Sequence, residues 1–286
     1  MIKYTLRKWK LVLPSFLLLF LTSCKRAVDA QGNLIEQNII RLGDKWSFSM
    51  GFFDALIVWP LAQLINFFSQ YVGVVGAIII ITLLVRLVTF RSTLESQVMN
   101  QKMQALQPKV MAIQEKYKGR TDQQAQMQMY AEQQNLYKKH DIKMSKMLLP
   151  TLLQLPVIMA LWSSVNRAEA VLNGYFLGNS LFTSPQVGMS EGKIFYFIIF
   201  GLVIVVNAVA MLLPQHLAKK KQRRYPNERP TPQQGKGMMY FMIAMMAWIG
   251  LTLSSAMSIY LIISSSVQIA QTLYTDHYMS KNGVRI

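Results

Sequence analysis

The sequence predicts an all-α, polytopic membrane protein of five transmembrane helices, with an N-terminal interfacial helix and a cytoplasmic helical hairpin. The 286 residues are 52% apolar and only 15% charged, whereas soluble domains carry about 25% charged residues. Several long stretches hold no charge at all, and a spanning helix needs about 20 predominantly apolar residues. These two observations together indicate a membrane protein.

The N-terminus has the anatomy of a secretory signal, with basic residues up to Lys10 followed by an apolar run over 11–21. The run ends in Leu21-Thr22-Ser23-Cys24, which resembles a bacterial lipobox. Residues 1–23 are therefore predicted to be a lipoprotein signal peptide. Cys24 would carry a diacylglycerol and palmitate at the outer surface. The alternative is an uncleaved anchor with an incidental cysteine.

Four uncharged stretches accommodate the helices. Residues 147–166 and 194–215 each fit one span, and residues 237–275 fit two spans joined by a tight turn near Ser254-Ser255. Residues 55–85 are too long for one upright helix. Their first part repeats polar residues at helical spacing, which favours a helix in the membrane interface before a first span at 72–90. These polar residues are Gln63, Asn66 and Gln70.

The charges of the connections predict the orientation. Residues 91–146 and 216–236 carry ten and seven Lys/Arg, whereas 25–54 and 167–193 carry four and two. The positive-inside rule makes the first pair cytoplasmic, with the mature N-terminus outside and the C-terminus inside a bacterial plasma membrane. The predicted segments are 1–23, signal peptide; 24–71, extracytoplasmic segment with the interfacial helix; 72–90, first span; 91–146, cytoplasmic hairpin; 147–275, spans two to five with the basic loop 216–236; and 276–286, short cytoplasmic tail.

The cytoplasmic hairpin is predicted from a narrow apolar seam between Met99 and Tyr117. Gly119-Arg120 interrupts the seam, and Thr121 with Gln124 fits a capping box that starts a second helix. The seam either joins the two helices to each other or, being rich in methionine, meets varied apolar partners.

Arg86 lies inside the apolar run 78–88, and an ionisable residue in a span is a functional-site hypothesis by default. Snorkelling to the cytoplasmic interface is the alternative. Gln154, Asn207 and Gln268 each lie about seven residues from the cytoplasmic end of their own helix, roughly 8–11 Å deep. A shared hydrated cavity would satisfy all four side chains, and pairwise hydrogen bonding between helices is the alternative.

The sequence gives little support for a metalloprotein, an enzyme or a secondary transporter. The three histidines lie far apart with no cluster of Cys, Asp or Glu around them, so no metal site is predicted. No nucleophile–base motif occurs in the spans, so an enzyme is not expected. A secondary transporter usually shows internal repeats and often an intramembrane acid, and neither is visible. A passive scaffold is the rival that the sequence excludes least.

From about Trp59 to Asp276 the chain resembles the YidC family of membrane protein insertases, which has mitochondrial and chloroplast relatives. The resemblance is most specific in Gly76 to Arg86, in Met103 to Lys109, and in Leu149-Pro150 through Gln154-Leu155-Pro156. The lipobox is similar to that of the Gram-positive branch.

The chain departs from the family at the last span. It has Ser255-Ala256-Met257 where Pro-Ala-Gly is usual, and Tyr260-Leu261 where the family has Tyr-Trp, so no role is carried over to Leu261. The resemblance implies an insertase with a hydrophilic inner-leaflet groove and Arg86 attracting acidic tails. It implies nascent membrane proteins as substrates and membrane lipids, the ribosome and the Sec translocon as candidate partners; a monomer is compatible with it.

Overall fold

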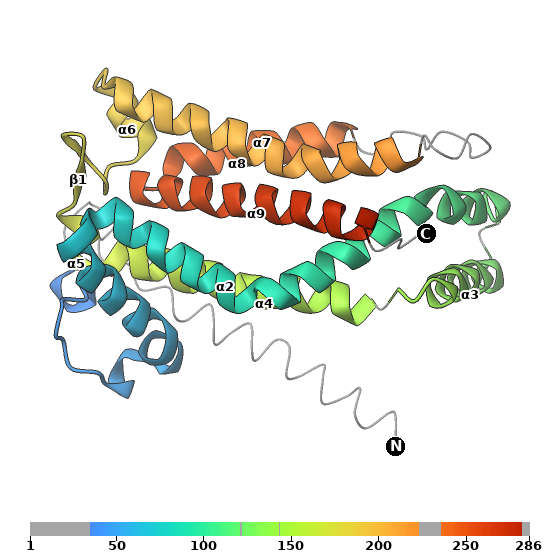
Figure 1. Cartoon of the computed structure of the whole chain (residues 1–286), viewed down its shortest axis with the longest axis horizontal. Coiled ribbons are helices and arrows are strands. Elements are labelled where there is room, and N and C mark those ends of the chain that lie inside the picture. The colour runs from blue at the N-terminus through green and yellow to red at the C-terminus, as the bar shows by residue number, and fades with distance from the viewer. Residues whose placement is uncertain (1–34, 121, 143, 223–235, 282–286) are drawn as a thin grey trace. The chain divides into compact units, whose positions relative to one another are not determined.

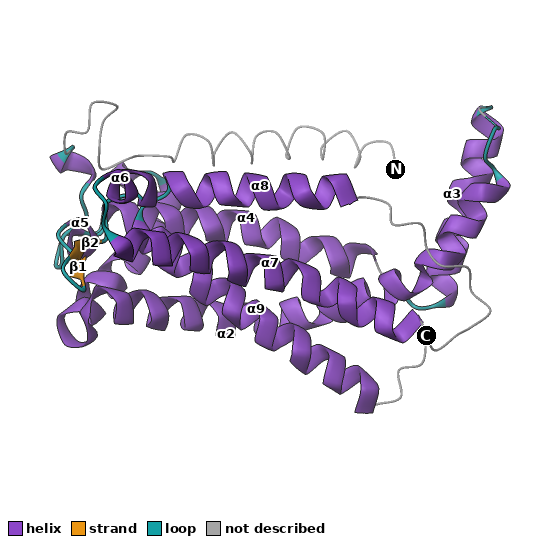
Figure 2. Ribbon diagram, turned by 90° about the horizontal axis from the view of Figure 1, so that it is seen from above, coloured by secondary structure: helices purple, strands orange, loops and turns teal. Residues whose placement is uncertain are grey.

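The computed structural model describes residues 35–120, 122–142, 144–222 and 236–281. Nearly all of this part of the chain is helical (Figure 2). The all-α prediction is therefore confirmed, apart from one sheet of two short strands. The elements are η1 (Glu36–Asn38), η2 (Phe48–Met50), the π-helix η3 (Asp54–Val58), α2 (Trp59–Lys116), α3 (Gln123–Lys139), α4 (Met144–Arg167), α5 (Glu169–Leu172), β1 (Tyr175–Phe176), β2 (Asn179–Ser180), α6 (Pro185–Ser190), α7 (Ile194–Gln222), α8 (Lys236–Thr252) and α9 (Ser255–Lys281).

Three helical segments in the described ranges are long and apolar enough to cross a membrane, namely Asp54–Gln104, Ile194–Leu217 and Ser255–Lys281. The apolar segment Tyr240–Thr252 is shorter. The tight turn expected inside 237–275 is present, because α8 ends at Thr252 and α9 begins at Ser255. A polytopic helical membrane protein is thus confirmed, while the count of five spans remains a prediction.

Helix α2 is interrupted by non-helical backbone at Gly73, with φ 72° and ψ 169°. This left-handed conformation suits glycine, which has no Cβ to clash. Gly73 lies beside residue 72, where the sequence predicts that the interfacial helix gives way to the first span. No helix end marks the predicted boundary at 90/91, because α2 continues to Lys116.

The chain forms two compact units, which we describe separately. The first unit comprises the chain up to Leu84 together with Leu153–Ile199 and Leu251–Tyr260. The second comprises Val85–Leu152, Phe200–Gly250 and Leu261–Ile286.

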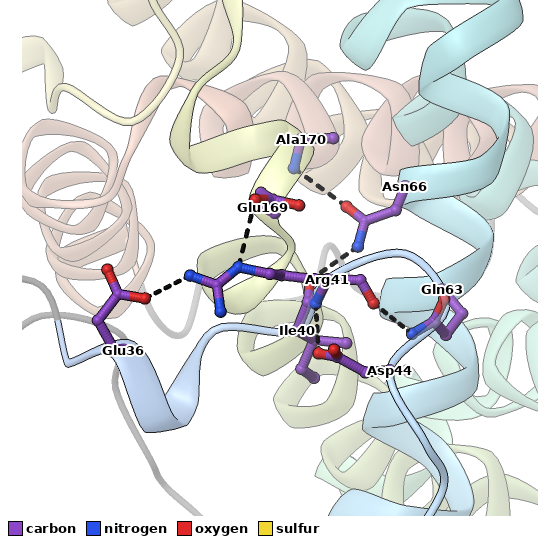
Figure 3. A network of polar contacts seen from close by, with 8 residues as sticks. All are labelled: Glu36, Ile40, Arg41, Asp44, Gln63, Asn66, Glu169 and Ala170. Carbon is purple, nitrogen blue, oxygen red and sulfur yellow. Dashed lines mark hydrogen bonds and ion pairs between the residues drawn. The ribbon is translucent and has the colours of Figure 1, made fainter.

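In the first unit, Asn66 of α2 binds two other segments of the chain. Its Nδ2 donates to the carbonyl oxygen of Ile40 at 2.7 Å, and its Oδ1 accepts from the Ala170 amide at 3.0 Å (Figure 3). The Ile40 amide in turn donates to the Arg167 carbonyl at 2.8 Å. Asn66 is only 4% exposed, so its side chain joins the N-terminal segment, α2 and the α4–α5 junction.

Gln63 and Arg41 extend this network at the surface (Figure 3). Gln63 Nε2 donates to the Arg41 carbonyl at 2.7 Å, and its Oε1 accepts from the Gly43 amide at 3.1 Å. The Arg41 guanidinium pairs with Glu36 and, at 3.4 Å, with Glu169. The segment around residue 40 lies beside the first turns of α2 and α5 (Figure 1). The polar face of the first part of α2 therefore binds the N-terminal segment of the protein itself.

The connection between α4 and α7 contains the β1–β2 hairpin, which lies next to α5 and α6 (Figures 1 and 2). Tyr196 is fully buried here, and its hydroxyl donates to the Ser180 carbonyl at 3.1 Å. Its ring lies directly against Gly188, where a Cβ would be 2.0 Å from Tyr196 Cδ2. Glycine at this position permits the close contact between α6 and α7.

In the second unit, α3 begins with Asp122 as its N-cap, whose Oδ2 accepts from the Ala125 amide at 3.0 Å. The expected capping box of Thr121 and Gln124 is wrong in its cap residue, since Asp122 makes the capping bond; Thr121 lies outside the described residues. The break expected at Gly119 is present, with φ 91°.

Helix α3 contacts the end of α2 through one carboxylate. Glu132 pairs with Lys116 and accepts a hydrogen bond from the Tyr117 hydroxyl at 3.1 Å. These contacts bring the two helices together across the turn at 117–122.

Candidate functional site

The candidate site begins with Arg86 on α2. The preceding turns of this helix bury Ile78, Ile81 and Thr82, while Leu87 and Val88 beyond it are 72% and 85% exposed. Arg86 itself is half-buried. A guanidinium keeps its charge at any physiological pH, so α2 holds a fixed positive charge within an apolar sequence.

Arg86 is held by α9. Its Nη2 donates to both the side-chain and the backbone oxygen of Ser264, with 3.2 Å to the carbonyl. Ser264 itself is 7% exposed. Hydrogen bonds from a charged donor are stronger than those between neutral groups, so the contact orients the guanidinium.

The next residue of α9 binds α7. Ser265 Oγ donates to Asn207 Oδ1 at 2.8 Å, and Asn207 Nδ2 donates to the Val203 carbonyl of its own helix at 2.8 Å. Asn207 and Ser265 are 9% and 7% exposed. The amide is therefore satisfied by protein groups at both ends, as a buried polar group requires.

Ser264 and Ser265, which we call the serine pair, thus serve two different helices. Consecutive residues of an α-helix point about 100° apart around its axis, so one reaches α2 while the other reaches α7. The sequence analysis identified Arg86 and Asn207 but missed the serine pair. The available signal was the run Ser264-Ser265-Ser266 in an apolar stretch.

The other two residues predicted for the groove are Gln268 and Gln154. Gln268 lies on α9 one turn beyond Ser264, with an exposed side chain. Gln154 is half-buried on α4 and belongs to the first compact unit. The structure therefore links Arg86 and Asn207 to adjacent residues of one helix, and the shared level of all four side chains remains a prediction. Cys24 lies outside the described residues.

This arrangement of side chains is suited to binding a charged group. A half-buried guanidinium can attract and orient a carboxylate. Within the described ranges, no group of three or more His, Cys, Asp or Glu residues could hold a metal ion. Long apolar helices that contact one another through polar side chains define a polytopic membrane protein, the class that contains transporters and insertases.

Comparisons with known proteins narrow this class. The profile of the 60Kd inner membrane protein family matches residues 66–282. The membrane protein insertase YidC of Enterococcus faecalis is 32% identical over 229 residues, covering 80% of this chain and 76% of that protein. The chain therefore belongs to this family, the YidC membrane protein insertases, whose members are insertases and not enzymes.

Other relatives differ in how much of them the chain spans. YidC of Mycoplasmopsis pulmonis is 28% identical over 275 residues, which cover 90% of this chain but 45% of that protein. MisCA, a membrane protein insertase of Bacillus subtilis, is 26% identical, with 77% and 78% covered. A crystal structure of an active YidC insertase shares the fold, with a TM-score of 0.54, 22% identity, and 81% and 47% of the two chains covered.

Proposed function

We propose that this protein inserts other proteins into the membrane by receiving a polar segment of the substrate at Arg86 while the apolar segment moves into lipid. The observation that carries the proposal is the half-buried Arg86 guanidinium, which Ser264 of another helix orients inside an apolar sequence. Partitioning of the apolar segment supplies the driving force, so the process requires no cofactor.

The proposed site is a hydrated inner-leaflet groove that contains Arg86, Gln154, Asn207 and Gln268. Polar groups within a bilayer need partners or water. Asn207 has protein partners, whereas the exposed amide of Gln268 would be hydrated by the groove. One chain carries all four side chains, so a monomer suffices.

The proposed topology has five spans, with α4 and α8 added to the three long apolar segments. The excess of Lys and Arg in 91–146 and 216–236 supports a cytoplasmic location for both connections and for the C-terminus. Lipidation of Cys24 would tether the N-terminus to the outer surface of the bacterial plasma membrane. Mass spectrometry finding an unmodified Cys24 in the mature protein would contradict the tether.

The proposed partners are nascent membrane proteins, with the ribosome and the Sec translocon as candidates. The names of the curated relatives support the substrate class. The contact of Glu132 with Lys116 and Tyr117 supports an antiparallel α2–α3 hairpin, and α3 exposes Met127 and Tyr130 to incoming chains. The basic loop 216–236 would attract ribosomal RNA or anionic lipid.

Reconstitution tests the function directly. The purified full-length protein is placed in vesicles, and insertion of a single-span substrate is scored by protease protection of its translocated tail. Two substrates differ only in Asp or Asn at matched tail positions. We expect Arg86→Gln to lose insertion of the Asp substrate and Arg86→Lys to retain much of it, because the charge attracts the tail at low local dielectric.

Arg91→Gln is the matched control, since Arg91 lies on the same helix with a side chain that is 95% exposed. It should insert both substrates like the wild type. Wild-type vesicles that insert no more substrate than protein-free vesicles would refute the function. Single cysteines placed near Arg86, Gln154, Asn207 and Gln268, in a background without Cys24, should react with water-soluble thiol reagents added from the cytosolic side if the groove exists.

A further inference from the structure

The serine pair of α9 holds two groups of different charge, a guanidinium from α2 and a neutral amide from α7. We propose that Ser264 is a positioning residue that orients the Arg86 guanidinium for acidic substrates. Ser265 instead stabilises the groove through the neutral Asn207 amide, so its effect does not depend on the charge of the substrate. This inference rests on the proposed function and assigns different roles to two adjacent side chains.

The geometry at Ser264 restricts the guanidinium. Two oxygens of the same residue accept from Arg86 Nη2, one of them the carbonyl at 3.2 Å. An arginine side chain has many rotamers, and fixing it in one costs conformational entropy. Because Ser264 helps to meet this cost before substrate arrives, the guanidinium is pre-organised for a carboxylate.

Both acceptors on Ser264 are neutral, so they orient the guanidinium without cancelling its charge. A carboxylate forms stronger hydrogen bonds with arginine than a hydroxyl or a carbonyl does. An arriving Asp or Glu can therefore bind the guanidinium while Ser264 continues to orient it, whereas an uncharged tail gains little. Ser264 should consequently influence acidic substrates selectively.

Ser265 and Ser266 provide internal comparisons. Ser265 donates to the Asn207 amide, so its loss disturbs a helix contact that carries no net charge. Ser266 is exposed, and its Oγ donates to the Ile262 carbonyl of its own helix at 2.8 Å. Substituting the three adjacent serines one at a time therefore tests three effects. Ser264 orients a charged group, Ser265 contacts a neutral amide of α7, and Ser266 makes a hydrogen bond within α9.

The experiment measures insertion by Ser264→Ala, Ser264→Thr, Ser265→Ala and Ser266→Ala with the matched Asp and Asn substrates. Ser264→Ala should insert the Asp substrate about three- to tenfold more slowly, the loss expected for one hydrogen bond while the backbone acceptor remains. It should leave the Asn substrate nearly unchanged. Ser264→Thr keeps the hydroxyl and should restore the rate.

The other variants complete the pattern. Ser265→Ala should slow both substrates equally, and Ser266→Ala should slow neither. In the Arg86→Gln background, Ser264→Ala should have no further effect, because its partner is gone. Equal unfolding temperatures of the Ser264 variants would exclude misfolding as the cause.

The outcomes separate the two proposals. If Arg86→Gln inserts the Asp substrate as well as the wild type does, the electrostatic role of Arg86 fails. If Arg86→Gln is impaired but Ser264→Ala is not, only the positioning role of Ser264 is overturned. Equal slowing of both substrates by Ser264→Ala would likewise overturn it, leaving a structural contact.

Discussion

Asp54 and Arg167 form a buried ion pair between η3 and the end of α4, with 2.6 Å between Asp54 Oδ2 and Arg167 Nη1. Their side chains are 1% and 3% exposed. Arg167 Nε also donates to the Asn38 carbonyl at 2.8 Å, so one guanidinium joins three segments of the first unit. Charges so deeply buried are tolerated when they are paired and hydrogen-bonded.

Asp54→Asn should lower the stability of the first unit by about 3–5 kcal/mol, because it leaves the Arg167 charge buried without its carboxylate. Thermal unfolding of the full-length protein in detergent measures the loss. Arg41→Gln is the control, since it removes a charge from exposed pairs and should barely change the unfolding temperature. Equal effects of the two substitutions would show that burial does not strengthen the Asp54 pair.

Asn66→Leu should loosen the N-terminal segment, because the Ala170 amide loses its acceptor and the Ile40 carbonyl keeps only the Glu169 amide as a donor. Each unsatisfied buried group costs about 1–3 kcal/mol. Amide hydrogen exchange at Ala170 should accelerate more than tenfold, and limited proteolysis should cut near residue 40. Gln70→Leu, an exposed position one turn further along α2, should change neither. Unchanged exchange at Ala170 would argue against the bridging role of Asn66.

Acid should weaken the contact between α2 and α3. The hydrogen bond from Lys116, aided by Tyr117, holds the pKa of Glu132 below its ordinary value of 4.5. A lowered carboxyl pKa stabilises the folded form above that ordinary value, and the contribution is lost as the pH falls through the folded pKa. The hydrogen bond with Glu132 also raises the pKa of Lys116 above 10.5. The contact should therefore be complete between about pH 4.5 and 10.5.

Spin labels on Gln114 and Gln134, exposed positions of the two helices, follow this contact as a distance. The distance distribution should broaden as the pH falls below about 4.5. Glu132→Gln should abolish the acid transition. A wild-type distribution that is the same at pH 3 and pH 7 would show that other contacts hold α3 in place.

Gly188→Ala should destabilise the first unit, since the new methyl group would overlap the Tyr196 ring. Inserting atoms into a packed site costs about 1–3 kcal/mol. Gly201→Ala is the control, because a Cβ there meets no atom within 4 Å and alanine favours the helix. Thermal unfolding should rank Gly188→Ala well below Gly201→Ala, and the reverse order would contradict the packing argument.

The polar face of the first part of α2 illustrates what periodicity can and cannot predict. The spacing of Gln63, Asn66 and Gln70 correctly predicts one polar face on a helix. It does not reveal what covers that face, because the partners Ile40 and Ala170 are distant in sequence. Asn66 binds protein groups, whereas Gln70 is exposed.

The site shows the same limit. Arg86 is conspicuous because a charge in an apolar run is costly and rare. Ser264 is not conspicuous, since a serine in a helix commonly bonds to the carbonyl one turn earlier, as Ser266 does with Ile262. Only the packing of α9 against α2 and α7 decides which serine reaches across to a neighbouring helix.

Helix α2 continues beyond Arg86 to Lys116, so a force applied to its far end would be transmitted along the helix to Arg86. At 1.5 Å per residue, Lys116 lies about 45 Å along the helix from Arg86, and both belong to the second unit. A partner that pushes the far end of α2 sideways therefore applies a torque to the turn that carries Arg86. Pro108, which removes one backbone hydrogen bond, is the place where such a load would flex the arm first.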